Sequence, residues 1–311
     1  MSIIRRSFLF LIYCFCMKAP KNLCILPFDH QTGLWKAFGW SDPITPDQDR
    51  MMRETRMITY DGYLYGLSLG IPSDETAILT DDIYGADVIA RAKSEHHSLI
   101  YTLEKSGQPS LIFQHENWQE RILQNKPEWI KTLVRYNPES NRDDLNKTLV
   151  NLKIVSDFAH DHQIPFMIEP LVQPTESQKD IPDYDHALRP ELTVRMIHEI
   201  YDAGIFPTVW KIEGSDDPKF YDHAATAIST YDKDSRIVTL GRNETLEQVC
   251  TWIKAGAQND AMIGFAVGRT VFLDAIKKYI SGQYTNQEAI EEIGRNYFTL
   301  YQTYKNAKTH E

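Results

Sequence analysis

Short apolar runs recur along the chain, each separated from the next by a helical pattern or by turn-forming residues. Such runs are typical of strands that are buried on both faces, as in a parallel sheet. Eight of them occur, at residues 23–28, 77–80, 99–103, 129–135, 165–169, 209–212, 237–240 and 262–267. Eight parallel strands that alternate with helices predict an α/β fold, a single (β/α)₈ barrel over residues 17–311.

The helical segments carry start and stop signals. Pro190 stands at a first helical position and Gly204 is a C-terminal stop. Four apolar residues between them share one face: Leu192, Met196, Ile197 and Ile200. Thr285 and Glu288 form a capping box for a final amphipathic helix. We expect this C-terminal helix to close the barrel or to provide the contact surface of a homo-oligomer.

An open, doubly wound sheet is the competing architecture. It usually binds a dinucleotide at a glycine-rich loop after its first strand. Here the first strand ends instead in Pro27-Phe28-Asp29-His30, without glycine. The pattern therefore favours the barrel, and no cofactor is predicted.

Residues 1–16 differ from the rest of the chain. Arg5 and Arg6 precede the apolar stretch Phe8–Cys16, in the order found in a secretory signal. The stretch is too short to span a bilayer, and no clear small-x-small cleavage pattern follows it. We expect a dispensable extension or a misassigned start, with a working signal peptide as the alternative.

The composition and net charge of the chain limit the kinds of molecule that it can bind. The chain has 311 residues, of which 42% are hydrophobic and 24% charged, as in an ordinary large globular domain. Its formal net charge of -10 argues against a nucleic-acid or acidic-membrane binder, because these need clustered positive surface. Four cysteines without a paired framework indicate a reducing, cytoplasmic setting. The expected partner is a small molecule.

One predicted strand carries a lysine among apolar residues. Lys211 lies inside the run Thr208–Glu213, and a lysine is costly to bury as a cation unless it is paired or used. A neutral lysine amine can attack a carbonyl and form a Schiff base. Barrel enzymes hold their chemistry at the carboxyl ends of the strands, so Lys211 is the candidate nucleophile.

Other charged residues are expected near this lysine. Lys131 shares a face of its strand with Arg135. We expect Lys131 to approach Lys211 across adjacent strands, where a second cation would favour the neutral amine. The competing interpretation is an ion-pair network in which Lys211 pairs with Glu169 or Glu213.

Two glycine-arginine pairs follow the seventh and eighth strands. Gly241-Arg242 and Gly268-Arg269 fall where this architecture often binds phosphate. Glycine admits backbone N–H groups there, and arginine supplies charge and bidentate donors. Either pair is weak evidence alone, but together they favour a phosphorylated substrate.

A metal-dependent mechanism is an alternative that would need several histidines or carboxylates at the same barrel mouth. A magnesium site of Asp29, Asp81 and Glu169 is the weaker rival, and no metal is predicted. Four histidines precede strands and should lie at the opposite end: His96, His97, His160 and His162.

The segment from Pro170 to Leu188 follows the fifth strand and has no strong periodicity. Barrel loops of this length are often lids or substrate contacts. We expect this segment to contribute to substrate specificity.

Five segments resemble the 2-deoxy-5-keto-gluconate 6-phosphate aldolase-like domain, which occurs alone or fused behind a sugar kinase in inositol catabolism. They are Leu26–His30, Leu133–Pro138, Leu188–Val194, Val209–Gly214 and Ile263–Thr270. The resemblance covers nearly everything from residue 23 to about residue 304. A more distant similarity to class I tagatose 1,6-bisphosphate aldolases implies a barrel with a Schiff-base lysine.

The second similarity implies roles for individual residues. It makes Lys211 the Schiff-base lysine, Lys131 a second active-site lysine and Glu169 a proton-transfer carboxylate. Asp29 would be the acidic residue that ends the first strand, and Arg269 a phosphate-binding arginine.

The chain departs from these families at two points. His30 stands where the tagatose aldolases usually have glutamine, so we expect the sugar hydroxyls to be recognised differently. No kinase domain precedes the barrel in this sequence, so we expect another protein to supply the phosphorylated substrate.

Residues and resemblance together predict a class I aldolase that cleaves a phosphorylated keto sugar or keto acid. The most specific prediction is cleavage of 2-deoxy-5-keto-D-gluconate 6-phosphate to dihydroxyacetone phosphate and malonic semialdehyde. One alternative is a tagatose-bisphosphate-like aldolase for another phosphosugar, and a second is a phosphosugar-binding regulatory protein without catalysis. The predicted catalytic residues are Lys211, Glu169, Lys131 and Asp29, and the predicted substrate ligands are Arg269, Gly268, Arg242, Gly241, His30 and Arg135.

Overall fold

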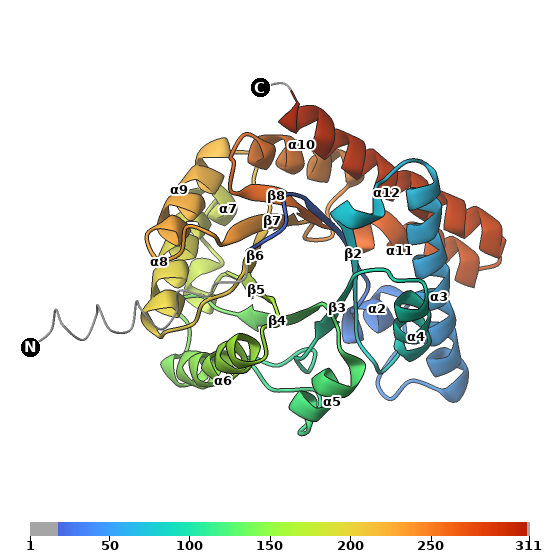
Figure 1. Ribbon diagram of the computed structural model, residues 1–311, viewed down its shortest axis with the longest axis horizontal. Coiled ribbons are helices and arrows are strands. Elements are labelled where there is room, and N and C mark those ends of the chain that lie inside the picture. The colour runs from blue at the N-terminus through green and yellow to red at the C-terminus, as the bar shows by residue number, and fades with distance from the viewer. Residues whose placement is uncertain (1–17, 310–311) are drawn as a thin grey trace, which may run out of the picture.

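Eight parallel strands close into a barrel in the computed structural model, which describes residues 18–309 (Figure 1). Each strand pairs with the next along the chain, and β8 pairs back with β1. This confirms the predicted (β/α)₈ barrel, and the open-sheet alternative is wrong. The predicted extension at residues 1–16 lies outside the described residues. The strands are β1 (Leu23–Pro27), β2 (Thr76–Thr80), β3 (Leu99–Thr102), β4 (Trp129–Arg135), β5 (Phe166–Leu171), β6 (Val209–Glu213), β7 (Arg236–Leu240) and β8 (Met262–Ala266).

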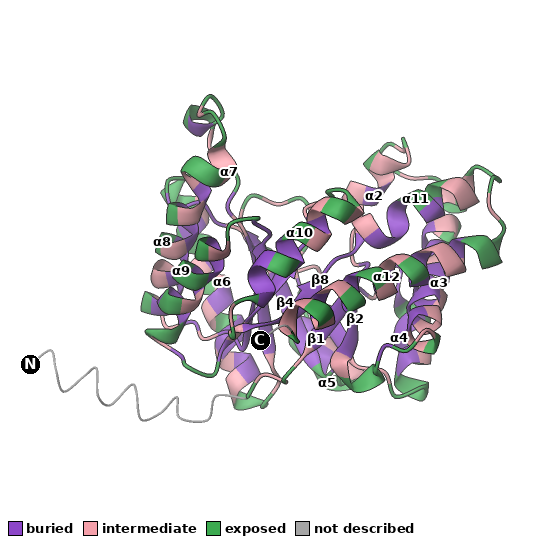
Figure 2. Cartoon of the chain, turned by 90° about the horizontal axis from the view of Figure 1, so that it is seen from above, coloured by how far each residue is buried: buried purple, intermediate pink, exposed green. Residues whose placement is uncertain are grey.

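Helices surround the strands, and the strands form the buried centre of the molecule (Figure 2). Among residues 18–309, no helix is both long and apolar enough to cross a membrane. The helices are α2 (Thr32–Ala37), α3 (Pro46–Ser68), α4 (Ala86–Ser94), α5 (Trp118–Asn125), α6 (Arg142–Asp161), α7 (Tyr184–Ala187), α8 (Arg189–Asp202), α9 (Pro218–Ser229), α10 (Leu246–Ala257), α11 (Arg269–Ile280) and α12 (Asn286–Lys308), with 3₁₀ turns at Ser73–Glu75 and Glu176–Gln178.

The strands separate two apolar cores. Successive side chains of a strand point to opposite faces, so Val209 packs inside the barrel while Trp210 and Ile212 pack against the helices. The same alternation brings Lys211 and Glu213 to the interior, where both line a cavity. The position of Lys211 therefore follows from the register of an ordinary buried strand.

The helix signals in the sequence are confirmed. α8 has proline in its first turn, and Gly204 beyond its end has a left-handed φ of +78°. Thr285 caps α12 in a capping box with Glu288. α12 packs across α3, α10 and α11 on the outside of the barrel (Figure 1). The hydroxyl of Tyr297 donates a hydrogen bond of 2.7 Å to the carbonyl oxygen of Cys24 in β1, which ties the last helix to the first strand.

β8 contains a bulge that depends on a glycine. Its register against β7 shifts by one residue at Ile263, so the strand carries one extra residue there. Gly264 has a φ of +154°, and a Cβ atom at this position would lie 2.1 Å from the carbonyl oxygen of Leu23. The bulge lets both Ile263 and Ala266 reach the inner core.

The segment after β5 is tied to the end of β4. β5 runs to Leu171, two residues past its predicted end, and a 3₁₀ turn and α7 follow. The side-chain amide of Asn137 donates to the carbonyl oxygen of Gln173 (2.8 Å) and to Oε1 of Gln178 (2.6 Å). α7 and α2 rise at the same end of the barrel (Figure 2). The segment is thus fixed beside the opening formed by the strand ends.

Candidate functional site

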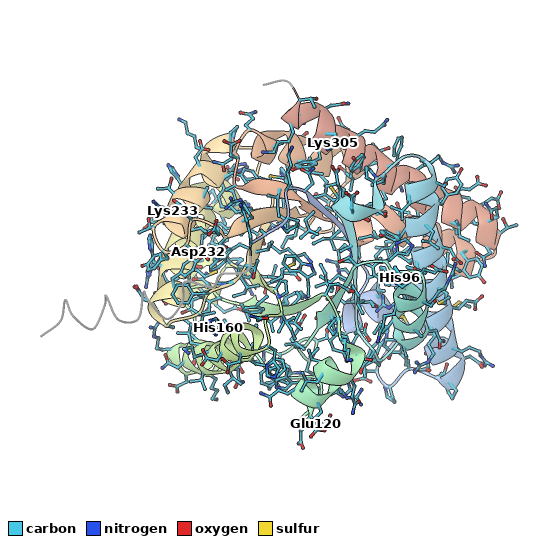
Figure 3. All side chains as sticks on the ribbon, viewed as in Figure 1. His96, Glu120, His160, Asp232, Lys233 and Lys305 are labelled. Atoms are coloured by element: carbon cyan, nitrogen blue, oxygen red, sulfur yellow. The ribbon has the colours of Figure 1, made fainter. Side chains whose placement is uncertain are left out.

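The carboxyl ends of the strands surround a cavity of about 950 Å³. Side chains project into the ring of strands throughout its centre (Figure 3). Cations outnumber carboxylates two to one among the lining residues, although the chain as a whole has a net charge of -10. Such a local excess favours an anionic ligand. The charged lining residues are Lys36, Lys105, Lys131, Arg135, Lys179, Lys211, Arg242 and Arg269, with Asp29, Glu104, Glu169 and Glu213.

Lys131 on β4 lies deep in this cavity among three carboxylates. Its Nζ is 2.9 Å from Oδ2 of Asp29, 2.7 Å from Oε1 of Glu104 and 2.8 Å from Oε2 of Glu169. Only 1% of the Lys131 side chain is exposed. Burial opposes its charge, but the three carboxylates outweigh burial and hold the pKa of Lys131 well above its usual value. Lys131 is therefore a fixed cation that keeps the carboxylates together.

Lys211 on β6 pairs with the second oxygen of one of these carboxylates. Its Nζ is 2.8 Å from Oε1 of Glu169, and 3% of its side chain is exposed. β5 lies between β4 and β6, so Glu169 bridges the two lysines. Lys131 does approach Lys211, but the expectation that their strands are adjacent is wrong, because β5 and its carboxylate lie between them. The competing interpretation, an ion pair between Lys211 and Glu169, is confirmed.

The three carboxylates differ in how firmly they hold a proton. Burial raises the pKa of each, but Lys131 and then His30 and Lys211 outweigh it at Asp29, whose pKa falls below its usual value. Lys131 and Lys211 lower the pKa of Glu169 in the same way. At Glu104 burial dominates, and its pKa is raised. Asp29 and Glu169 are thus the charged proton acceptors of the cluster.

His30 follows Asp29 at the end of β1 and has a free ring nitrogen. Its Nδ1 is 3.9 Å from Oδ1 of Asp29 and has no hydrogen-bond partner. The ring packs edge-on against Phe272, with centroids 6.1 Å apart. Burial, assisted by Arg269, lowers the pKa of His30 to about 3. The imidazole is therefore neutral near pH 7 and can exchange a hydrogen bond with a substrate hydroxyl.

The predicted pair Gly268-Arg269 lies at the start of α11, which follows β8 directly. No side chain caps this helix, so its first N–H groups are available to an anion. Arg269 lines the cavity, and within residues 18–309 no carboxylate lies within ion-pair distance of it. A Cβ at Gly268 would lie 2.2 Å from the carbonyl oxygen of Pro27. Only glycine allows this close approach of the two strand ends.

The second predicted pair, Gly241-Arg242, lines the same cavity, but its arginine is already paired. Nη1 of Arg242 is 2.7 Å from Oδ2 of Asp185, and Nε is 3.2 Å from Oε1 of Glu213. Two carboxylates thus offset the charge of Arg242. Arg269 is the stronger anion ligand of the two arginines.

Arg135, the last residue of β4, also lines the cavity. Its Nη1 donates a hydrogen bond of 2.9 Å to the carbonyl oxygen of Gln108. The segment after β5 contributes Gln173, Pro174 and Lys179 to the lining.

Of the three residues of the magnesium rival, Asp29 and Glu169 both contact Lys131, but Asp81 is held elsewhere. Asp81 does not line the cavity. Its Oδ2 lies 3.4 Å from Nη2 of Arg56, and its Oδ1 accepts hydrogen bonds from the backbone N–H groups of Ile83 and Tyr84. In the part of the chain that the structure describes, no cluster of three His, Cys, Asp or Glu side chains is arranged to hold a metal ion. His96 and His160 lie outside the ring of strands (Figure 3).

Glu104 is the site residue to which the sequence patterns assigned no role. It follows β3, and a backbone bridge to Phe113 fixes it there. Thr102 Oγ1 donates a hydrogen bond of 2.7 Å to Oε2 of Glu104. Because Ile100 faces the inner core, the alternation of β3 continues through Thr102 to Glu104. That alternation places the Glu104 side chain at the mouth of the barrel, where it lines the cavity.

The closed ring of eight parallel strands with helices outside it defines the class of protein as a TIM barrel. An archaeal fructose 1,6-bisphosphate aldolase has this fold, with 14% identity, a TM-score of 0.55, and coverage of 92% of this chain and 94% of that chain. A structure described as a Schiff-base-forming fructose-1,6-bisphosphate aldolase is 13% identical, with a TM-score of 0.55 and coverage of 91% of this chain and 94% of that chain. A protein from Corynebacterium glutamicum is 14% identical, with a TM-score of 0.58 and coverage of 96% of this chain and 98% of that chain.

Residues 15–308 match one protein family, described as an uncharacterized protein conserved in bacteria (DUF2090), and the chain belongs to it. No curated protein matches the chain.

Proposed function

We propose that this protein is a class I aldolase that cleaves a phosphorylated keto sugar or keto acid through a Schiff base on Lys211. The observation that carries the proposal is the carboxylate of Glu169, which contacts Lys211 and Lys131 at 2.8 Å each. A lysine must lose its proton before it can attack a ketone. Glu169 is positioned to accept that proton, while Lys131 keeps Glu169 ionised.

The proposed substrate is 2-deoxy-5-keto-D-gluconate 6-phosphate, supported by the resemblance of five segments to the corresponding aldolase-like domain. Its phosphate would bind at Arg269 and the free N–H groups of α11, with Gly241 and Arg242 on the other side. Helix N-termini and arginine both favour phosphate. The products would be dihydroxyacetone phosphate and malonic semialdehyde.

The reaction begins when the Lys211 amine adds to the ketone carbon and water leaves, which gives an iminium. Its positive nitrogen draws in the electron pair of the breaking carbon–carbon bond, and an enamine forms. The hydroxyl proton on the other fragment passes to Glu169 or Asp29, and the aldehyde departs. Protonation of the enamine carbon and addition of one water then release dihydroxyacetone phosphate and regenerate Lys211.

Borohydride trapping tests the covalent step. The protein is incubated with dihydroxyacetone phosphate and sodium borohydride, digested, and mapped by mass spectrometry. We expect one reduced adduct, on the peptide that contains Lys211. Lys211→Met should abolish the adduct, whereas Lys254→Met, at an exposed position of α10, should leave it unchanged.

Other outcomes would support the rivals. Loss of turnover on chelation, without an adduct on Lys211, would favour metal-assisted cleavage. Tight binding of a phosphorylated ketose without turnover, unchanged in Lys211→Ala, would favour a regulatory binding protein. A panel of phosphorylated ketoses, assayed for triose phosphate release, separates this substrate from that of a tagatose-bisphosphate-like aldolase.

A further inference from the structure

Half of the eight cations that line the cavity have a carboxylate partner among residues 18–309. Lys131 and Lys211 share Glu169, and Arg242 pairs with Asp185 and Glu213. Lys179 pairs with Glu176 outside the cavity. Of the remaining lining cations, Lys36 and Lys105 are exposed to solvent. Two sheltered guanidinium groups are left without a carboxylate in ion-pair distance among residues 18–309, those of Arg135 and Arg269.

These two arginines lie on opposite walls of the barrel. Arg135 ends β4 and Arg269 follows β8, and in a closed ring of eight strands β4 and β8 are four strands apart in either direction (Figure 1). Lys211 on β6 lies midway between them, and Glu169 on β5 lies between Lys211 and Arg135. From β8 to β4 the order of these groups around the ring is therefore an arginine without a carboxylate partner (Arg269), a lysine (Lys211), a carboxylate (Glu169) and a second arginine without a carboxylate partner (Arg135).

Arg135 stands nearer the mouth than the lysine cluster. In the register of β4 and β5, Leu133 is level with Glu169 and Arg135 is level with Leu171. Two residues of strand correspond to about 7 Å. The hydrogen bond from Nη1 to Gln108 uses one of five guanidinium donors. An incoming anion would thus meet an oriented arginine with most of its donors free.

We infer that Arg135 binds a carboxylate at the end of the substrate remote from the phosphate and selects acid-terminated substrates. This inference rests on the proposed function. With the phosphate at Arg269 and the ketone at Lys211, the bond to be cleaved lies beside Glu169, and the far end of a six-carbon chain extends toward Arg135. The order of groups around the wall then matches phosphate, ketone, hydroxyl and carboxylate along a keto acid phosphate.

The surroundings of Arg135 fit a carboxylate better than a second phosphate. The Arg269 end offers a helix N-terminus without a side-chain cap, which suits a dianion. Beyond Arg135 the backbone N–H of Tyr136 is bonded to Leu171, and Pro138 has none. The next helix, α6, is capped by the side chain of Asn141 and has two aspartates in its first turn. The residues that follow Arg135 thus add neither a free helix N-terminus nor an N–H group of Tyr136 or Pro138, and a single arginine matches a single negative charge.

The test uses the aldol direction, with dihydroxyacetone phosphate and three aldehydes: malonic semialdehyde, neutral propanal, and glyceraldehyde 3-phosphate. We expect Arg135→Gln to raise KM for malonic semialdehyde 10- to 100-fold and KM for propanal less than 3-fold. Arg135→Lys should fall between, because it keeps the charge but loses the bidentate geometry. Arg195→Gln, at an exposed position of α8, is the matched control.

An equal rise in KM for malonic semialdehyde and propanal in Arg135→Gln would overturn the inference. So would a lower KM of the unmodified protein for glyceraldehyde 3-phosphate than for malonic semialdehyde, because Arg135 would then serve a phosphate. If dihydroxyacetone phosphate forms its adduct on Lys211 but no aldehyde is accepted, the acid-end site fails while the Schiff-base proposal stands. Absence of the adduct itself would refute the proposed function.

Discussion

Glu169 is the residue on which the proposed chemistry of the cavity depends. Its two oxygens hold two buried lysines that would otherwise face each other without an anion between them. A bridging carboxylate of this kind can pass a proton to or from either neighbour. The proposed role is chemical as well as structural, so a variant that tests it must remove the charge of Glu169 while keeping the size of the side chain.

Glu169→Gln should lower kcat for cleavage by about 10²- to 10⁴-fold, because the amide cannot accept the substrate or lysine proton. The size of the side chain is retained, so we expect circular dichroism to show a folded barrel. Glu191→Gln, at an exposed position of α8, serves as the control. A kcat within threefold of the unmodified value would assign the proton transfer to Asp29 instead.

His30 makes the free energy of unfolding depend on pH, and this contribution can be measured separately. Its pKa is about 3 in the folded chain and 6.5 in the reference state. Below pH 6.5 the unfolded chain therefore takes up a proton that the folded chain does not accept until near pH 3. The contribution of His30 to the free energy of unfolding is fully present above pH 6.5 and is lost as the pH falls toward 3.

Urea unfolding at pH 6.5 and pH 4.5 should therefore show a smaller loss of stability in His30→Asn than in the unmodified protein. The measurements stop at pH 4.5 because the pKa values of Asp29 and Glu169 are depressed in the folded chain. Protonation of these two carboxylates would cause a further loss of stability at lower pH. If the free energy of unfolding fell equally with pH in the unmodified protein and in His30→Asn, the imidazole would already be protonated in the folded chain.

At the scale of elements, the strands and helices follow from local patterns while the bulge does not. Apolar runs and capping signals located all eight strands, α8 and α12 to within a few residues. The sequence Met262-Ile-Gly-Phe-Ala266 reads as one continuous strand. Its extra residue appears only when β8 must pair with β7 and β1 at once, because ring closure fixes both registers.

Gly264→Ala should destabilise the protein by at least about 2 kcal/mol, because the new Cβ meets the backbone of Leu23 and the φ of Gly264 disfavours a side chain. Gly33→Ala is the matched control, since a Cβ in that helix meets nothing within 4 Å and alanine favours helices. We expect the control to be neutral or slightly stabilising. Thermal unfolding of both variants measures the difference, and equal melting temperatures would contradict the account of the bulge.

At the scale of the whole molecule, the barrel accounts for the chain from β1 to α12. The family match begins at residue 15 and the first strand at Leu23. Lys18 and Lys21, which precede this strand, are exposed. Truncation is tolerated where the backbone lost is neither buried nor paired.

A variant that lacks residues 1–16 should unfold within about 2 °C of the full chain and retain its activity. A longer deletion through Ile25 removes most of β1 and breaks the pairing with both β2 and β8. We expect that variant not to fold, and its soluble yield and circular dichroism provide the comparison. A large loss of stability on removal of residues 1–16 alone would assign them to the domain.

The barrel and the faces of its strands could be predicted from the order of residues alone, because alternation with a period of two residues is a local property. Lys131, Glu169 and Lys211 were therefore predicted to face inward, and the structure brings all three together. Local spacing does not set the distance between strands that lie far apart in the chain.

Closure of the barrel decided which strands are neighbours and which of their side chains form ion pairs. It inserted β5 between β4 and β6, so Glu169 bridges the lysines instead of leaving them in contact. It also brought Asp185 to Arg242 across 57 positions of sequence. It left Arg135 and Arg269 on opposite walls, with no carboxylate from residues 18–309 within ion-pair distance of either. The tilt and order of all eight strands decide which charged side chains form ion pairs and which have no carboxylate partner. That information is present in the tertiary structure and not in the local sequence pattern.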